Sequence, residues 1–97
     1  GVIESPPFTL DAPGYILLVG GGNDPENVYV AIVDADSGEE LARYTGTFVN
    51  PVRAVPFDAS GHAGKKAFIR VVDRATEGWG HINFGGIFER PEPRLLD

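Results

Sequence analysis

The chain contains neither cysteine nor methionine. Without cysteine it can form no disulfide bond and no cysteine-ligated zinc site. A chain that lacks methionine and begins at Gly1 is expected to be a fragment or mature piece of a longer protein. The lack of cysteine does not by itself fix the cellular compartment.

Basic residues are scarce in the first half of the chain. Arg43 is the only one up to Asn50, against eight acidic residues, and the net charge of the whole chain is −6. Nucleic acids and anionic membranes bind basic surfaces, so neither is expected as a partner. Long apolar runs are also missing, and none approaches the roughly 18 residues that a membrane-spanning helix needs.

No stretch has an apolar period of helical length. Instead, 13 glycines and 8 prolines divide the 97 residues into short β-rich runs, a spacing typical of an all-β sandwich or barrel. We expect one domain over residues 1–89, built as a two-sheet antiparallel β-sandwich of about eight strands in a jelly-roll arrangement. Residues 90–97 are polar and proline-rich, as in a linker. The expected strands are 2–4, 8–10, 15–19, 28–33, 41–45, 52–57, 66–73 and 81–88.

The side-chain pattern within these runs places some of the strands. Residues 28–33 are apolar on both faces, which predicts a central strand covered on both sides. Residues 34–39 have the composition of a hairpin turn, and Pro56 favours an edge strand or a bulge. The expected core comprises Ile3, Phe8, Ile16, Leu18, Val30, Ile32, Ile69, Val71, Ile82 and Ile87.

Three segments together resemble a known family. They are residues 1–8 (Gly-Val-Ile-Glu-Ser-Pro-Pro-Phe), 18–23 (Leu-Val-Gly-Gly-Gly-Asn) and 72–83, which includes Gly-Trp-Gly-His-Ile-Asn. The chain resembles the galactose-binding-like β-sandwich module associated with levanases and other fructan-cleaving glycoside hydrolases. It departs from that pattern at Gly85 and Gly86, where such modules often carry an aspartate.

Loops gather at the ends of a sandwich and often carry function, so a ligand site is expected at the glycine-rich loops 20–27 and 76–80. The expected ligand-binding residues are Asn23, Arg43, Arg70, Asp73, Trp79 and His81. Trp79 is the only tryptophan, and it either stacks on a sugar ring or fills the core. His81 either donates to a sugar hydroxyl or ties a loop to the sheet. The arginines and Asp73 either converge on a ligand or form surface ion pairs.

Other motifs are explained without a ligand. The run Gly20-Gly21-Gly22 lacks the Lys-Ser/Thr pair and the helix of a phosphate-binding loop. Asp34 and Asp36 match only part of the spacing of a calcium loop, and turns favour aspartate for their own reasons. We therefore expect no catalytic residues, no metal-ligating residues and no cofactor, with a structural calcium ion left open.

The predicted function is that of a non-catalytic accessory module of a secreted, bacterial glycoside hydrolase. It would bind a polysaccharide or oligosaccharide, with fructan (levan or inulin) as the substrate class that the resemblance implies. The alternative is a structural sandwich that packs on a neighbouring catalytic domain without binding sugar. Hydrolysis by this chain alone is disfavoured, because glycosidases need two carboxylates in one cleft.

Overall fold

The computed structural model describes residues 1–46, 49–74 and 82–90, of which the side chains of 49–52 and 83 are left undescribed. These residues form eight β-strands and one short 3₁₀ turn, Ser60–His62. The strands are β1 (Val2–Glu4), β2 (Phe8–Thr9), β3 (Gly14–Gly21), β4 (Val28–Asp34), β5 (Glu40–Tyr44), β6 (Val49–Asp58), β7 (Lys66–Asp73) and β8 (Ile82–Arg90). All eight predicted strands are present, each within a few residues of its expected bounds.

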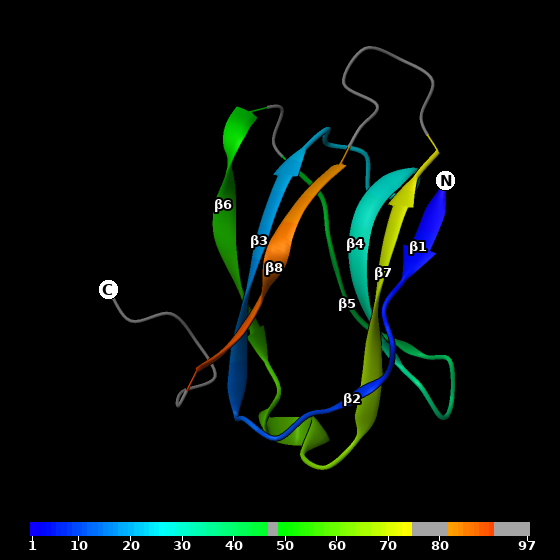
Figure 1. Ribbon diagram of the computed structural model, residues 1–97, viewed down its shortest axis with the longest axis vertical. Helices are drawn as coiled ribbons and strands as arrows, with labels where there is room; N and C mark the ends of the chain where they lie inside the picture. The colour runs from blue at the N-terminus through cyan, green and yellow to red at the C-terminus, as the bar shows by residue number, and fades with distance from the viewer. Residues whose placement is uncertain (47–48, 75–81, 91–97) are drawn as a thin grey trace.

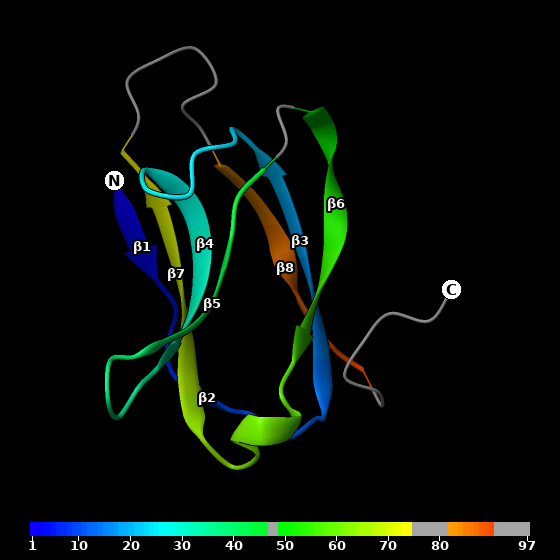
Figure 2. The same ribbon diagram turned by 180° about the vertical axis from the view of Figure 1, so that it is seen from behind.

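The strands form two antiparallel sheets that face each other, with the core between them (Figure 1). The larger sheet has the order β1-β7-β4-β5, with β2 continuing the β1 edge by pairing with β7. The smaller sheet has the order β6-β3-β8. The predicted two-sheet sandwich is therefore confirmed, whereas a jelly-roll connection of the strands is not shown. Figure 2 shows the opposite edge of the sandwich, formed by β5 and β6.

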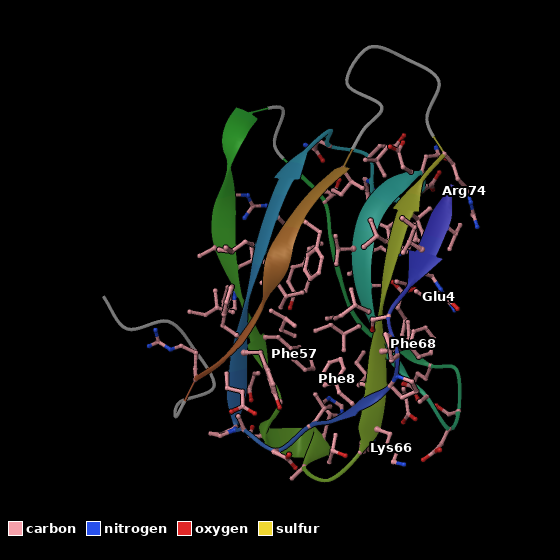
Figure 3. All side chains as sticks on the ribbon, in the orientation of Figure 1. Glu4, Phe8, Phe57, Lys66, Phe68 and Arg74 are labelled. Carbon is pink, nitrogen blue, oxygen red and sulfur yellow. The ribbon has the colours of Figure 1, made fainter. Side chains whose placement is uncertain are left out.

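The main core lies between the sheets. Figure 3 shows Phe8 and Phe57 projecting into this space from opposite sheets. The buried side chains of this cluster are Leu10, Tyr15, Leu17, Val19, Val30, Ile32, Val55, Phe57, Ala59, Ala67 and Ile69. Phe8, Val71, Ile82 and Ile87, which were predicted as core, are partly buried and pack against it.

Three predicted core residues lie elsewhere. On β3 it is Tyr15, Leu17 and Val19 that enter the core, so Ile16 and Leu18 occupy the outer face and are only half-buried. Ile3 is 72% exposed, although its neighbour in register, Val71, contacts the core. The reason is that β1 lies at the edge of the larger sheet, where no described strand of the smaller sheet covers it.

The larger sheet also buries apolar side chains on its outer face. β4 is fully buried along its length, as its two apolar faces predicted, because β5 and β7 flank it. Its outward side chains Tyr29, Ala31 and Val33 form a second cluster with Val72 of β7, and Phe68 packs against this cluster. Long charged side chains from the neighbouring strands cover these apolar groups, as described below.

Local sequence explains two turns, those that follow β4 and β6. The carboxylate of Asp34 accepts hydrogen bonds from the backbone N–H groups of Asp36 (2.9 Å) and Ser37 (3.2 Å). These bonds hold its pKa below the ordinary value and close the hairpin, in which Gly38 has φ = 77°. Asp58 caps its turn in the same way, accepting hydrogen bonds from the backbone N–H and the hydroxyl of Ser60.

No helix among the described residues is long and apolar enough to cross a membrane. Of the predicted linker, only Arg90 is described, and it ends β8.

Candidate functional site

The loop between β3 and β4 forms one end of the sandwich, and Asp24 organises it. Its carboxylate accepts hydrogen bonds from the backbone N–H groups of Glu26 and Asn27, both at 3.2 Å, and from the side-chain amide of Asn27 at 3.1 Å. The hydrogen bond from the Asn27 side chain is the main reason why the pKa of Asp24 lies below its ordinary value. The side chain of Asp24 is therefore engaged within the loop itself.

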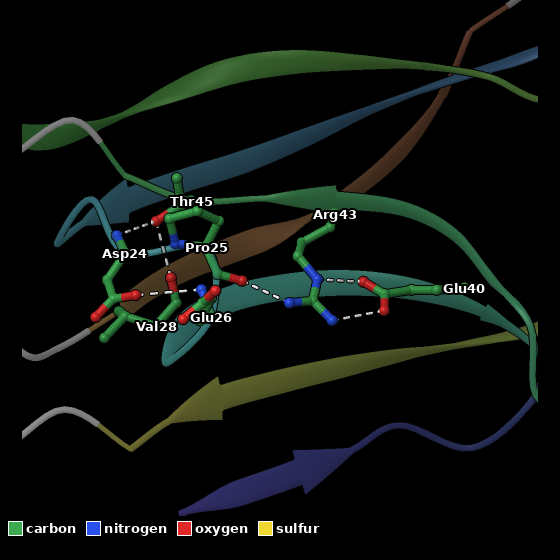
Figure 4. A network of polar contacts seen from close by, with 7 residues as sticks. All are labelled: Asp24, Pro25, Glu26, Val28, Glu40, Arg43 and Thr45. Atoms are coloured by element: carbon green, nitrogen blue, oxygen red, sulfur yellow. Dashed lines mark hydrogen bonds and ion pairs between the residues drawn. The ribbon is translucent and has the colours of Figure 1, made fainter.

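Thr45, which directly follows β5, fixes the same loop from the neighbouring strand (Figure 4). Its hydroxyl oxygen accepts the N–H of Asp24 at 2.9 Å, and the hydroxyl lies 2.9 Å and 2.8 Å from the carbonyl oxygens of Gly22 and Val28. Gly46 follows immediately, and its N–H donates to the same Gly22 carbonyl at 2.9 Å. A Cβ on Gly46 would lie 2.1 Å from the carbonyl oxygen of Gly21, so this close approach requires glycine.

Arg43 holds the loop from the outer face of the larger sheet. Its guanidinium donates to both carboxylate oxygens of Glu40, at 2.5 Å and 2.6 Å, and to the carbonyl oxygen of Pro25 at 2.5 Å. It also lies over the ring of Tyr29, 3.7 Å from the ring centre. The hydrogen bond from Arg43 is the main reason why the pKa of Glu40 is lowered. Arg43 thus positions the loop, and its expected role as a ligand donor stays a prediction.

Arg70 lies on the same outer face as Arg43 but is bound differently. It donates from Nε to the Glu4 carboxylate at 2.7 Å and lies 5.4 Å from the ring centre of Phe68. Both arginines pair in register with Ala31 of the central strand, one from each side. The structure thus brings the two arginines near each other. Arg43 forms an ion pair with Glu40 and Arg70 with Glu4, and both side chains cover the second apolar cluster.

Asp73 ends β7 beside the loop. It pairs in register with Val28, and its backbone exchanges hydrogen bonds with Gly1. The next residue, Arg74, donates its N–H to the carbonyl oxygen of Asn27 at 2.7 Å. The side chain of Asp73 is half-buried, and Asn23 in the loop is exposed. Asn23 and Asp73 therefore lie at the same end of the sandwich, as predicted.

The other two predicted site residues, Trp79 and His81, lie outside the described residues. The segment that contains them connects the end of β7 to the start of β8. Their roles stay predictions.

The departure from the family pattern at Gly85 and Gly86 has a structural reason. These residues lie at the bulge where β8 shifts its register against β3. Gly86 has φ = 130°, which a residue with a side chain rarely adopts. A Cβ on Gly85 would approach Cβ of Leu18 to 3.0 Å. An aspartate at either position would strain this bulge.

Thr45 and Arg74 were not predicted as part of this end. Asp24 could have been found, since Asn23-Asp24-Pro25-Glu26-Asn27 has the composition of a side-chain-capped turn. The partners of the Thr45 hydroxyl are 17 to 23 residues away in the chain, so no local signal identifies it.

A second surface feature is an apolar groove between the two sheets, open along the edge formed by β1, β2 and β8. It has a volume of about 340 Å³ and is lined by Ile3, Ser5, Pro6, Phe8, Ile69, Val71, Phe84, Gly86 and Ile87. A hollow of about 370 Å³ adjoins it, because Phe8 and Ile87 also line that hollow. This second hollow is polar, with the carboxylates of Asp11 and Glu89 among its lining residues.

In the part of the chain that the structure describes, no group of three or more His, Cys, Asp or Glu side chains is arranged to hold a metal ion. The calcium ion that the sequence left open stays a prediction.

Comparison with known proteins gives one informative similarity. The chain is 34% identical over 83 residues to "Putative glycosyl hydrolase ecdE" of Aspergillus rugulosus. The aligned region covers 86% of this chain but 12% of that protein. The chain is thus similar to a small part of a glycosyl hydrolase. No protein-family model matches the sequence, and no solved structure matches it.

Proposed function

We propose that this chain is a non-catalytic, carbohydrate-binding accessory module of a secreted glycoside hydrolase, with fructan as its polymer. The observation that carries the proposal is the hydrogen-bonded β3–β4 loop, which presents exposed Asn23 at the same end of the sandwich as Asp73. The similarity to a small part of a glycosyl hydrolase supports the association with such enzymes. Fructan follows from the resemblance to levanase-associated modules.

The geometry of this end suits sugar recognition. An amide and a carboxylate offer donors and acceptors for hydroxyl groups, the kind of polar contacts that orient a ligand. Asp24, Thr45 and Arg43 hold the loop in place before any ligand arrives, which lowers the entropy lost on binding. A module of this kind aids an enzyme by raising its effective concentration near a long polymer.

The proposal is tested by affinity electrophoresis of the 97-residue chain in gels that contain levan, inulin or arabinan, followed by calorimetry with fructo-oligosaccharides. Asn23→Ala and Asp73→Ala should each weaken binding about tenfold, the effect of losing one good hydrogen bond to the ligand. Asp36→Ala is the matched control, because this exposed carboxylate lies in the hairpin at the opposite end of β4.

Two results would refute the proposal. Unretarded migration on every polysaccharide would exclude sugar binding by the chain. Binding that survives in both site variants but is lost in the Asp36→Ala control would place the ligand elsewhere on the sandwich.

The apolar groove favours a second candidate function, that of a structural module that packs against another part of its parent protein. Removing the domain from the parent would then lower the melting temperature without changing substrate affinity. Loss of affinity with unchanged thermal stability would select the carbohydrate-binding function instead.

A further inference from the structure

The two sheets do not match in width at the groove. β8 faces β4 and β7 of the larger sheet, while the main contacts of β1 are with its neighbour β7. The larger sheet therefore extends one strand beyond β8. Strands in a sheet lie about 4.8 Å apart, so one further strand beside β8 would lie opposite β1 and β2.

The side chains on both walls of the groove are those of an uncovered core. Ile3 and Phe8 on one wall and Phe84 and Ile87 on the other are apolar, and all face the space between the sheets. Ile3 is nevertheless 72% exposed. Because burial of apolar surface is favourable, an apolar side chain that covered these residues would stabilise the molecule.

The backbone of β8 is also available for pairing. One edge of β8 is bonded to β3, and none of the described strands pairs with its other edge. Long open edges attract a further strand, and natural proteins usually blunt them with proline or lysine. The nine residues of β8 include neither, although the bulge at Gly85 and Gly86 interrupts the regular edge locally.

We propose that this groove binds one extended β-strand from a part of the parent polypeptide outside these 97 residues. The strand adds to the free edge of β8, and its alternate, inward side chains are apolar and cover Ile3, Phe8 and Ile87. The carboxylates of Asp11 and Glu89 at the adjoining hollow call for a basic residue at the corresponding end of the strand. That the strand comes from the parent polypeptide rests on the proposed function, because it requires a parent longer than this chain. The similar glycosyl hydrolase supports this, since the aligned region is only 12% of its length.

Other occupants fit less well. An apolar small molecule would cover the side chains but would leave the N–H and C=O groups of β8 without partners. A second copy that paired through its own β8 would bring two overhanging β1 strands into the same space, because each larger sheet extends past its β8.

Thiol labelling tests the proposal, since the chain has no cysteine of its own. Ile3→Cys places a thiol on the groove, and Ala63→Cys places one at an exposed loop position outside it. In the 97-residue chain both thiols should react with a maleimide at similar rates. In the full-length parent, Cys at position 3 should react at least about tenfold more slowly, with the loop control unchanged.

A benzophenone attached at the same cysteine identifies the occupant in the parent. An intramolecular cross-link to a segment outside the 97 residues supports the proposal. A cross-link between two chains, an adduct with a non-peptide molecule, or equal labelling rates in chain and parent would each overturn it. Sugar binding is measured on the 97-residue chain with Asn23 and Asp73 variants, so failure of either proposal is seen separately.

Discussion

Replacing Thr45 with valine tests whether one hydroxyl holds the β3–β4 loop. Valine has nearly the same shape and a similar strand preference, so the change removes the hydroxyl and little else. That hydroxyl accepts one hydrogen bond, from the N–H of Asp24, and donates its single hydrogen to one of two carbonyl oxygens, those of Gly22 and Val28. Two hydrogen bonds are lost, although Gly22 keeps the N–H of Gly46 as a donor.

The expected cost follows from these two bonds. Each contributes roughly 0.5–1.5 kcal/mol net, so Thr45→Val should lower the free energy of unfolding by about 2 kcal/mol. For a domain of this size, that corresponds to a melting temperature about 10 °C lower. Circular dichroism during heating measures the change. Thr45→Ser, which keeps the hydroxyl, should lose much less, and Thr9→Val in exposed β2 serves as the control. The reasoning is refuted if Thr45→Val has the same melting temperature as the unmodified chain, or if Thr45→Ser lowers the melting temperature as much as Thr45→Val does.

Two further predictions concern the core and a buried phenol. Leu17 is fully buried and Ile3 is 72% exposed, so Leu17→Ala should cost about 3 kcal/mol in urea denaturation and Ile3→Ala less than about 1 kcal/mol. If both variants lost the same free energy of unfolding, Ile3 would be as buried as Leu17 and the groove would be closed in this chain. Burial raises the pKa of Tyr44 from 10.0 to about 12, so its contribution to stability is complete below pH 10 and is lost as the pH rises toward 12. The difference between the absorbance titrations of the unmodified chain and Tyr44→Phe should show one phenol that ionises near pH 12; a difference centred near pH 10 would contradict this.

Local composition predicted the strands well because turns in this chain are marked by glycine, proline and aspartate. The side of each strand that faces the core was harder to predict. On β3 every residue from Tyr15 to Val19 is apolar, so a period of two fits either face equally. Only the pairing of β3 with β6 and β8 decides that Leu17, not Leu18, is buried.

The surroundings of the expected site residues could be predicted only in part, for a similar reason. Asn23 and Asp73 could be placed at one end from the order of strands and loops. The roles of the arginines depend on partners that the sequence does not reveal. Glu4 is 66 residues from Arg70, and Pro25 is 18 residues from Arg43, so their contacts arise only when the sheet forms. Ile3 shows the same limit, since its exposure depends on the number of strands in the opposite sheet.

The position of proline in β6 limits how the sandwich can assemble. β6 forms the other edge of the smaller sheet, as Pro56 predicted, and it also contains Pro51. Proline has no N–H to offer an incoming strand, so growth at this edge is blocked. The smaller sheet is therefore extendable in one direction only. Head-to-tail growth of a fibre through this sheet would require β6 of one copy to pair with β8 of the next, and the prolines of β6 oppose that pairing at the first step.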